Sequence, residues 1–486
     1  MYHASRFAAR LWRIVRLNSR PSPASDPHAA LCARGDASVA AARPAAERDP
    51  LRPVYHLAAP AFWINDPNGP VFHAGRYHMF FQHNPYGSEW GNMSWAHAAS
   101  LDLVRWKHLP IALAPTPGAC DKDGIFSGCC VIRYGVPTIL YTGVSPEVQC
   151  IATSDDDLIA WTKRPATPVI AARPRDDLEG FRDPFVWKEP DAWYMVLGSG
   201  IKGLGGTALL YRSPDLLNWD YLHPLCVGFG TNWECPNFFP LGGRHVLVVS
   251  PHGDVQYAVG AYAGRRFVPD AWHPLDLGGA SNFYAPNCLQ DPSGRRIMWG
   301  WARGGGTPGA PWNGCLTLPR VLTLRPDHRL GIEPLPELKT LRGTGTRRDG
   351  MRLGADERRA VDAPASDCME IAADIEPGSA QAIALELREP SDGGAGVAVT
   401  WDRQLKRLSC GQTGGAFEPG PGEDVLRLRV FVDKSVLEIY ANGTAVLTAR
   451  VYPRNREGFA VSLVATGGTA TARRVEVWPM KTIWDT

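Results

Sequence analysis

A repeated Asp-Leu-x-x-Trp sequence constrains the fold of this chain more than any other feature. It occurs at Asp102–Trp106, Asp157–Trp161 and Asp215–Trp219, so that the three copies begin 55 and 58 residues apart. Short runs of β-branched and aromatic residues, separated by turn residues, follow each copy. A fixed period with a recurring aromatic signature is typical of a β-propeller, in which each repeat forms one four-stranded blade.

Residues 51–342 contain the three copies and 13 of the 17 tryptophans. At about 57 residues per repeat, this stretch has room for five blades. A single twisted blade cannot bury both of its faces, and stacking blades around an axis covers them. The sequence therefore predicts a five-bladed β-propeller over 51–342, with a narrow, funnel-shaped central channel.

Residues 343–486 lack the repeat but keep the pattern of strands. Leu426–Val430 alternates between apolar and basic residues, as a half-buried strand does. Asn442-Gly443 separates two further apolar runs, and this pair readily adopts the positive φ angles of a type I′ hairpin turn. A C-terminal β-sandwich packed on the propeller is predicted, which makes the fold class all-β.

Residues 1–50 are rich in Ala, Arg and Pro and offer little material for a core. No acid precedes Asp26, and arginines recur at helical spacing at Arg6, Arg10, Arg13, Arg16 and Arg20. An Arg-rich, acid-poor start is typical of organelle targeting, whereas the simpler alternative is a disordered extension without a role. No stretch approaches the roughly 18 apolar residues of a membrane span, so no membrane partner is expected.

The charge balance and the cysteines of the chain argue against nucleic-acid binding, a zinc site and a disulfide framework. The chain has 51 basic and 49 acidic residues, which gives no basic field for nucleic acid. Its 11 cysteines include no C-x-x-C pair, so neither a zinc site nor a disulfide framework is indicated. Buried free thiols in a reducing compartment are the simplest interpretation, and a cytoplasmic location is expected, with organelle targeting left open.

Three acidic residues stand in distinctive surroundings: Asp66 in Trp63–Gly69, Asp183 in Phe181–Pro184 and Glu234 in Trp233–Pro236. Each has an aromatic residue within three positions and a Pro within two. They fall in different predicted blades, whose innermost strands all end at one rim of the axis, so the three carboxylates can converge. The alternative is that these Asp-Pro pairs only start turns, as Asp26-Pro27, Asp49-Pro50 and Asp291-Pro292 are expected to do.

Converging carboxylates suit the cleavage of a glycosidic bond, which needs one protonated and one ionised carboxyl group at the same pH. The surroundings must therefore separate their pKa values. We expect Trp233 to raise the pKa of Glu234 and Arg182 to favour ionised Asp183. Asn65 and Asn68 are expected to donate hydrogen bonds to ionised Asp66, and nearby aromatic rings and amides suit a sugar: Trp63, Trp90, Trp95, Gln82 and Asn84.

These three motifs and Phe126–Gly128 resemble the β-fructofuranosidase family, glycoside hydrolase family 32. Further stretches are similar, namely Tyr77–Pro85, Trp90–His97, Gln256–Gly260, Phe283–Asn287, Trp299–Trp301 and Phe431–Tyr440. The motifs follow one another in the family's order, and the resemblance runs from about residue 51 to the end.

The resemblance implies a role for each matching residue. Asp66 corresponds to the nucleophile, Glu234 to the general acid/base and Asp183 to the transition-state stabiliser. The implied fructose pocket consists of Asn65, Gln82, Trp90, Phe126, Ser127, Arg182, Tyr284 and Trp301. The implied reaction releases terminal β-D-fructofuranosyl units with retained configuration through a covalent fructosyl-enzyme, without a metal or an organic cofactor, and sucrose is the simplest substrate.

Several alternatives stay open at this point. A fructosyltransferase or a fructan hydrolase could use the same scaffold, and a carbohydrate-binding protein without catalysis is a third reading. Sucrose 6-phosphate, inulin and levan are not separated from sucrose, and the oligomeric state is not indicated. Asp254 either helps to bind the leaving sugar or forms a Gly-Asp turn. Two departures from the family pattern, Leu275–Gly279 and Asn287-Cys288, are expected on the leaving-group side.

Overall fold

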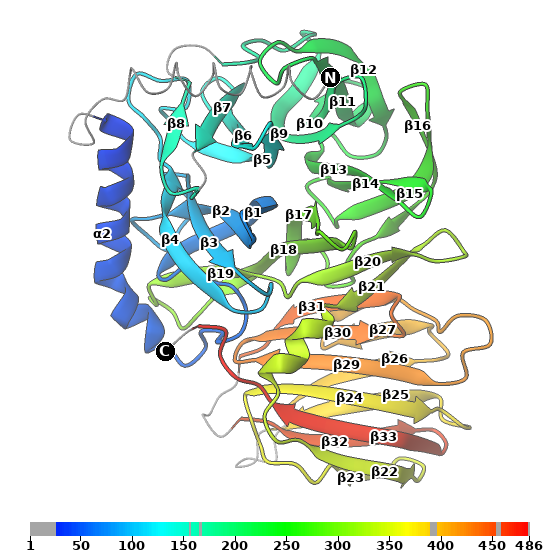
Figure 1. Cartoon of the computed structure of the whole chain (residues 1–486). Coiled ribbons are helices and arrows are strands. Elements are labelled where there is room, and N and C mark those ends of the chain that lie inside the picture. Colours follow the sequence, from blue (N-terminus) through cyan, green and yellow to red (C-terminus); the bar gives the residue numbers. More distant parts are fainter. Residues whose placement is uncertain (1–25, 155–156, 165–167, 389–395, 453–457, 485–486) are drawn as a thin grey trace.

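The structure, a computed structural model, describes residues 26–154, 157–164, 168–388, 396–452 and 458–484. Figure 1 shows a ring of blades with a two-layered β domain beneath it. Apart from helix α2 and the short 3-10 helix η2 (Pro336–Leu341), the regular elements of these residues are strands. The predicted all-β fold is confirmed.

Four blades are antiparallel sheets whose strands follow one another in sequence. Blade I consists of β1 (Phe62–His73), β2 (Arg76–Asn84), β3 (Ser94–Ser100) and β4 (Trp106–Leu113). Blade II consists of β5 (Ile125–Arg133), β6 (Val136–Gly143), β7 (Val148–Ser154) and β8 (Trp161–Lys163). Blade III consists of β9 (Leu178–Lys188), β10 (Trp193–Ile201), β11 (Gly205–Ser213) and β12 (Asp220–Val227). Blade IV consists of β13 (Glu234–Leu241), β14 (Arg244–Ser250), β15 (Gln256–Ala263) and β16 (Arg266–Pro274).

Blade V closes the ring. It consists of β17 (Phe283–Gln290), β18 (Arg296–Gly305), β20 (Arg320–Leu324) and β21 (Leu330–Pro334). Strand β19 (Trp312–Leu316) pairs antiparallel with β18 and parallel with β1, so one continuous sheet joins blade V to blade I. This ladder removes the free edges at which an open ring would separate. The predicted five-bladed propeller is confirmed.

The Asp-Leu-x-x-Trp repeat forms the turn before the outermost strand of blades I to III. In the first copy, the Asp102 carboxylate accepts hydrogen bonds from the backbone N–H groups of Val104 and Arg105, at 2.9 and 2.7 Å. Leu103 has a φ of 66°, and the Trp106 indole donates to its carbonyl at 3.2 Å. The same indole bond recurs in the other two copies. The repeat therefore shapes a corner of each blade and contributes nothing to the functional site.

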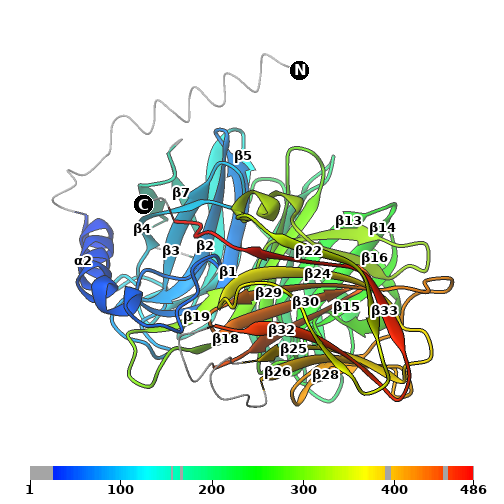
Figure 2. The same cartoon turned by 90° about the horizontal axis from the view of Figure 1, so that it is seen from below.

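The C-terminal domain is a sandwich of two six-stranded sheets (Figures 1 and 2). The first contains β22 (Thr346–Leu353), β33 (Ala470–Pro479), β24 (Cys368–Glu376), β29 (Leu426–Asp433), β30 (Val436–Ala441) and β31 (Ala445–Arg450). The second contains β23 (Arg358–Ala360), β32 (Ala460–Thr466), β25 (Ala382–Arg388), β26 (Val397–Asp402), β27 (Arg407–Cys410) and β28 (Thr413–Ala416). The predicted hairpin joins β30 and β31, and Asn442 and Gly443 both have positive φ angles.

A buried charge cluster joins the sandwich to the propeller. His56, which precedes β1, bonds Asp433 through Nδ1 at 2.7 Å and Glu438 through Nε2 at 3.1 Å. Arg320 of blade V bridges Glu438 and Asp276, each at 2.8 Å. All five side chains are almost completely buried. Since removing one partner would leave an uncompensated buried charge, this cluster fixes how the two domains dock.

The protonated His56 side chain should stabilise the domain interface at neutral pH and lose this effect at alkaline pH. Burial lowers the pKa of His56, but hydrogen bonds to Asp433 and Glu438 outweigh it and raise the pKa from 6.5 to about 9. Its contribution is complete below about pH 6.5 and is lost as the pH rises through 9. We expect Tm, measured by calorimetry, to fall more steeply between pH 7 and 10 in the wild type than in His56→Gln. Equal slopes would contradict this assignment.

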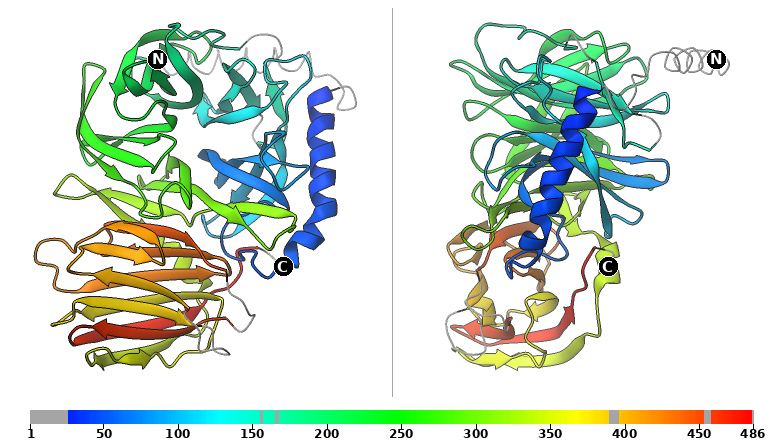
Figure 3. Two further views of the ribbon diagram at one scale, coloured as in Figure 1. Left: turned by 180° about the vertical axis from the view of Figure 1, so that it is seen from behind. Right: turned by 90° about the vertical axis from the view of Figure 1, so that its left-hand side faces the viewer.

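Part of the N-terminal extension forms a helix instead of a disordered segment, and organelle targeting stays a prediction. Helix α2 (Pro27–Glu47) lies along the outer edge of blade I, beside β4 (Figure 3). A Cβ atom at Gly35 would lie 2.7 Å from the Ile111 side chain, so the helix and strand are in close contact there. The buried face of the helix consists of small residues with little hydrophobic contrast, which hid it in the sequence. The Arg-rich repeat at 6–20 lies outside the described residues.

Candidate active site

The site is built from the innermost strands of the five blades, β1, β5, β9, β13 and β17. Each of them loses its regular pairing with the next strand at the rim of the channel. The breaks fall between Ile64 and Pro67, Ile125 and Gly128, Arg182 and Phe185, Glu234 and Asn237, and Tyr284 and Asn287. A β-bulge re-aims the side chains beside it. Asp66, Asp183 and Glu234 each lie within or next to such a break.

Asp66 of β1 has hydrogen-bond donors at both carboxylate oxygens. Ser127 Oγ donates to Oδ2 at 2.5 Å, and Asn65 Nδ2 donates to Oδ1 at 2.9 Å. Asn65 is held in turn by Gln82 Oε1 at 2.5 Å and by the Trp63 indole at 2.7 Å. Burial raises the pKa of Asp66, while the bonds from Ser127 and Asn65 act in the opposite direction.

Asp183 of β9 is 6% exposed and has a φ of 63°, in the region that L-residues rarely adopt. Its Oδ2 accepts the Cys235 backbone N–H at 2.9 Å. Burial raises the pKa of Asp183 to about 7, because it outweighs the nearby Arg182 guanidinium. Arg182 favours the ionised form of Asp183, as expected, but its effect is smaller than that of burial. No hydrogen bond joins the two side chains in the described part of the chain.

Glu234 of β13 is the acid that Arg182 binds. Arg182 donates through Nε and Nη2 to Glu234 Oε1, at 3.1 and 2.8 Å, and through Nη1 to Glu147 at 2.6 Å. Tyr284 Oη donates to Glu234 Oε2 at 2.8 Å, and His252 Nε2 lies 3.6 Å from Oε1. Both oxygens of Glu234 are thus held in a fixed orientation by residues of blades III, IV and V.

The Cys235 thiol shows that the acids converge. Its Sγ lies 3.3 Å from Asp66 Oδ2 and 3.6 Å from Asp183 Oδ2, and Glu234 is the preceding residue. Carboxyl groups of blades I, III and IV therefore meet at one end of the central channel. Burial raises the pKa of the Cys235 thiol, so it stays protonated and can donate its one proton to either carboxylate.

The other residues expected in the pocket lie around these acids. Trp301 of β18 packs edge-on against Trp63, with ring centroids 5.4 Å apart. Trp90 is 58% exposed and meets Phe126 at 6.1 Å, so it stands at the open edge of the site. Asp254 is exposed and accepts the Ala280 N–H at 2.9 Å. Asp254 thus ties two loops together on the blade IV side.

Two expectations about individual residues are wrong, and a third stays a prediction. Asn68 does not donate to Asp66: its Oδ1 accepts the Gly128 N–H at 3.2 Å, and its side-chain nitrogen has no partner in the described chain. Leu275–Gly279 contacts the sandwich, since the Leu277 N–H bonds the Val446 carbonyl, and its place relative to the leaving group stays a prediction. Asn287 lies deeper in the channel, where its Nδ2 donates to the Gly128 carbonyl.

The sequence reading missed four contributors to the site. Cys235 stands inside a recognised motif, so its place between two carboxylates could have been suspected. Glu147, His252 and Arg303 lie outside every motif, and only the fold brings them in. Arg303 stacks on the rings of Trp301 and Tyr284, with its guanidinium carbon 4.6 and 5.8 Å from their centroids.

Two kinds of feature are absent from the described residues. No group of three or more His, Cys, Asp or Glu side chains there could hold a metal ion. No helix there is long and apolar enough to span a membrane.

The carboxyl groups of this site can supply a nucleophile, a proton donor and a charge stabiliser around one sugar ring.

Comparison with family models gives two adjacent matches. The model of the glycosyl hydrolases family 32 N-terminal domain matches residues 56–334, and that of the family's C-terminal domain matches residues 337–479. The matched stretches contain all the acids of the site.

Curated proteins and solved structures agree with these matches. A sucrose-6-phosphate hydrolase of Escherichia coli is 35% identical over 470 residues, which cover 88% of this chain and 94% of that protein. A raffinose invertase of Escherichia coli is 34% identical, with the same coverage. The structure of a GH32 β-fructofuranosidase from Bombyx mori superposes with a TM-score of 0.79 at 29% identity, covering 93% of this chain and 98% of that one. Fructan 1-exohydrolase IIa from Cichorium intybus gives 0.81 at 26% identity, covering 90% and 99%.

Proposed function

Because the chain belongs to glycosyl hydrolase family 32 and is a β-fructofuranosidase, we propose that it hydrolyses sucrose with Asp66, Asp183 and Glu234 as its catalytic residues. The observation that carries this assignment is the contact of the Cys235 thiol with Asp66 and Asp183, directly beside Glu234. A furanose ring bound at this end of the channel would meet all three carboxyl groups.

In the first step, Asp66 attacks the anomeric carbon of the fructosyl unit while Glu234 protonates the departing oxygen. The hydrogen bonds from Ser127 and Asn65 orient Asp66 and favour its ionised form, as a nucleophile requires. Arg182 and Tyr284 position Glu234 beside the bond that breaks. The product of this step is a fructosyl ester of Asp66.

In the second step, Glu234 takes a proton from water, and the water attacks the same carbon and releases fructose. Two displacements at one carbon give retained configuration. Asp183, like Asp66, lies beside the Cys235 thiol, and its negative charge stabilises the positive charge that the ring develops. Asn65 and Gln82 supply polar contacts, while Trp90, Phe126 and Trp301 supply apolar faces for the sugar.

Sucrose 6-phosphate is a second candidate substrate, and Arg303 is the observation that favours it. Its guanidinium donates to the Ala280 carbonyl at 2.7 Å and forms no ion pair within the described residues. It stacks on Tyr284, which holds Glu234, and therefore stands on the side of the departing oxygen. A phosphate on the leaving glucose could pair with it.

The Arg303 assignment predicts a change in substrate preference. We expect Arg303→Gln to lower kcat/KM for sucrose 6-phosphate by about tenfold, the usual worth of one charge-assisted hydrogen bond, and to leave sucrose nearly unchanged. Initial rates on both substrates measure the ratio. An equal loss on both would remove Arg303 from phosphate recognition.

The proposed reaction is tested with the purified full chain on sucrose, sucrose 6-phosphate, raffinose, inulin and levan. We expect free fructose from sucrose, and a loss of about 10³-fold or more in Glu234→Gln, which cannot supply the proton. Oligosaccharides in excess of free fructose at high sucrose would favour a fructosyltransferase. Absence of turnover on every substrate would leave a carbohydrate-binding protein.

The oxidation state of the cysteines indicates in which cellular compartment the protein resides. All eleven cysteines are free, and nine of them are buried. Free thiols persist in reducing compartments, so we propose the cytoplasm. Thiol titration of the denatured protein, after purification without reductant, is expected to detect all of them.

A further inference from the structure

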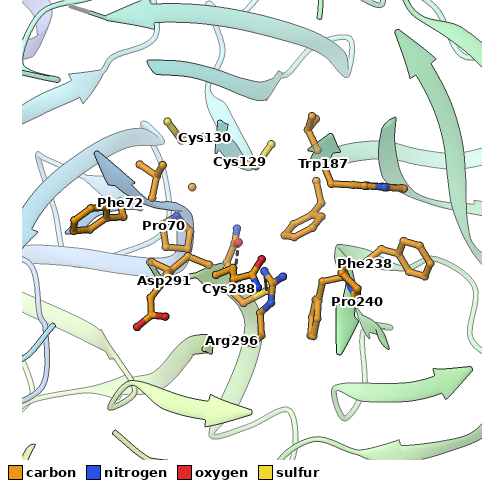
Figure 4. A pocket seen from close by; sticks show the side chains of 18 of the residues that line it. Pro70, Phe72, Cys129, Cys130, Trp187, Phe238, Pro240, Cys288, Asp291 and Arg296 are labelled. Carbon is orange, nitrogen blue, oxygen red and sulfur yellow. Dashed lines mark hydrogen bonds between the residues drawn. The ribbon is translucent and has the colours of Figure 1, made fainter. Parts of the chain in front are cut away.

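The central channel has a second cavity at the end opposite the acids. This rear cavity has a volume of about 360 Å³. The same five inner strands line it, further along the chain than the acids, with residues such as Phe72, Cys130, Trp187, Phe238 and Cys288 (Figure 4). The lining begins two to four residues beyond the acids, at Gly69, Phe185 and Phe238, and at about 3.3 Å per residue this places the cavity about 7 to 13 Å further along the channel. It is therefore a separate place at which a ligand could bind.

Arg296 of β18 lines the rear cavity and has no anionic partner among the described residues. It is 8% exposed, its Nε atom is buried without any partner in the described chain, and its Nη1 reaches the Cys288 sulfur at 3.9 Å. The guanidinium lies over the Phe239 ring at 4.6 Å. Asp291, which also lines the cavity, is already bonded by Ser293 and Arg295, each at 2.8 Å.

An unpaired buried cation is unusual, because removing a charge from water is expensive unless an opposite charge compensates for it. Arg320 of the same protein is also buried, but its charge is compensated by ion pairs with Glu438 and Asp276. Arg296 has only an aromatic face and a thiol. A ligand that brings one negative charge into the rear cavity would supply the missing partner.

We propose that the rear cavity binds a small monocarboxylate with an apolar body, whose carboxylate pairs with Arg296. The apolar walls suit a hydrocarbon or aromatic body. A single unpaired guanidinium matches one negative charge, while the Asp291 carboxylate at the wall disfavours a dianion such as sulfate or hydrogen phosphate. This inference does not rest on the hydrolytic activity.

A layer of buried amides separates the rear cavity from the catalytic pocket. Asn237 Nδ2 donates to the Cys235 and Pro286 carbonyls at 3.0 and 2.8 Å, and Asn287 Nδ2 donates to the Gly128 carbonyl at 3.1 Å. These side chains cross-link the inner strands of blades II, IV and V. A ligand on Arg296 should therefore bind whether or not the catalytic pocket is occupied.

The wild-type protein can test the proposal with three probes of similar shape: benzoate, benzyl alcohol and benzamidine. Calorimetric titrations are run with fructose at saturation, so that the catalytic pocket is blocked. We expect benzoate to bind and to raise Tm, and the neutral and cationic probes to bind at least tenfold more weakly. Equal binding of benzoate and benzyl alcohol would overturn the proposal, as would no binding of benzoate.

Variants then locate the site. Arg296→Met keeps the length and apolar stem of the side chain without its charge, and it should weaken benzoate binding at least tenfold, with Arg296→Lys in between. The matched control is Arg358→Met, because Arg358 is paired with Glu386 in the sandwich and does not line the cavity. Unchanged affinity in Arg296→Met, or an equal loss in Arg358→Met, would place benzoate elsewhere. If Arg296→Met does not fold, the benzoate affinity of Arg296→Lys and the comparison of the three probes on the wild type still test the proposal.

Discussion

Asp66→Asn is expected to reduce kcat for sucrose by about 10⁴-fold or more, because an amide cannot form the fructosyl ester that the two-step reaction requires. Ser127 Oγ and Asn65 Nδ2 both donate to the present carboxylate. The Asn side chain has one oxygen to receive such a bond, so the variant should fold with little rearrangement. Initial rates of fructose release, together with Tm, measure the two consequences separately.

Asp254→Asn is the matched control for this variant. Asp254 is exposed, and its one bond within the described chain is accepted from a backbone N–H, which an amide oxygen can also accept. It should keep kcat within a few-fold of the wild type. Wild-type turnover in Asp66→Asn, with the protein sequence verified, would refute the assignment of the nucleophile.

Asp183→Asn should lower activity and raise stability at once. Burial holds the pKa of Asp183 at about 7, above its ordinary value of 3.8, so between those values the folded protein binds more protons than the unfolded chain. The free energy of unfolding therefore falls as the pH rises from 4 to 7. An amide carries no charge, and at pH 8 it should stabilise the protein by up to about 4 kcal/mol, while kcat falls by about 10² to 10³.

Calorimetry at pH 4 and pH 8 tests the stability effect. The Tm of Asp183→Asn should exceed that of the wild type at pH 8 and equal it at pH 4, where the wild-type carboxyl is already protonated in the fold. Asp254→Asn should show no such difference, because its side chain is exposed. An Asp183→Asn variant that is less stable at pH 8 would mean that the buried charge is compensated in the fold.

The sequence predicted the architecture and the identity of the acids because both leave a local trace. Trp106, Trp161 and Trp219 mark the same corner of successive blades, and each indole bonds the carbonyl three residues before it. The sequence of helix α2 contains no comparable local pattern. Its buried face is made of small residues such as Gly35 and Ala46, so its contact with β4 depends on close approach and not on a hydrophobic stripe.

The sequence did not indicate which carboxylates Arg182 binds. Arg182 precedes Asp183 in sequence, yet successive side chains of a strand point to opposite faces, and here the guanidinium turns to Glu234 and Glu147. Glu147 follows β6 in a stretch with no recognisable motif. The pKa of Asp183 likewise depends on how far the surrounding blades exclude water.

The sequence by itself determined the number of blades, the sandwich that follows them and which carboxylates belong to the family's motifs, since these are properties of residue order and period. Only the tertiary structure decided which donor reaches which carboxylate, how the His56 cluster docks the two domains and that Arg296 lies unpaired at the far end of the channel. Such features depend on distances between residues far apart in the chain, and electrostatic energies vary steeply with distance and burial.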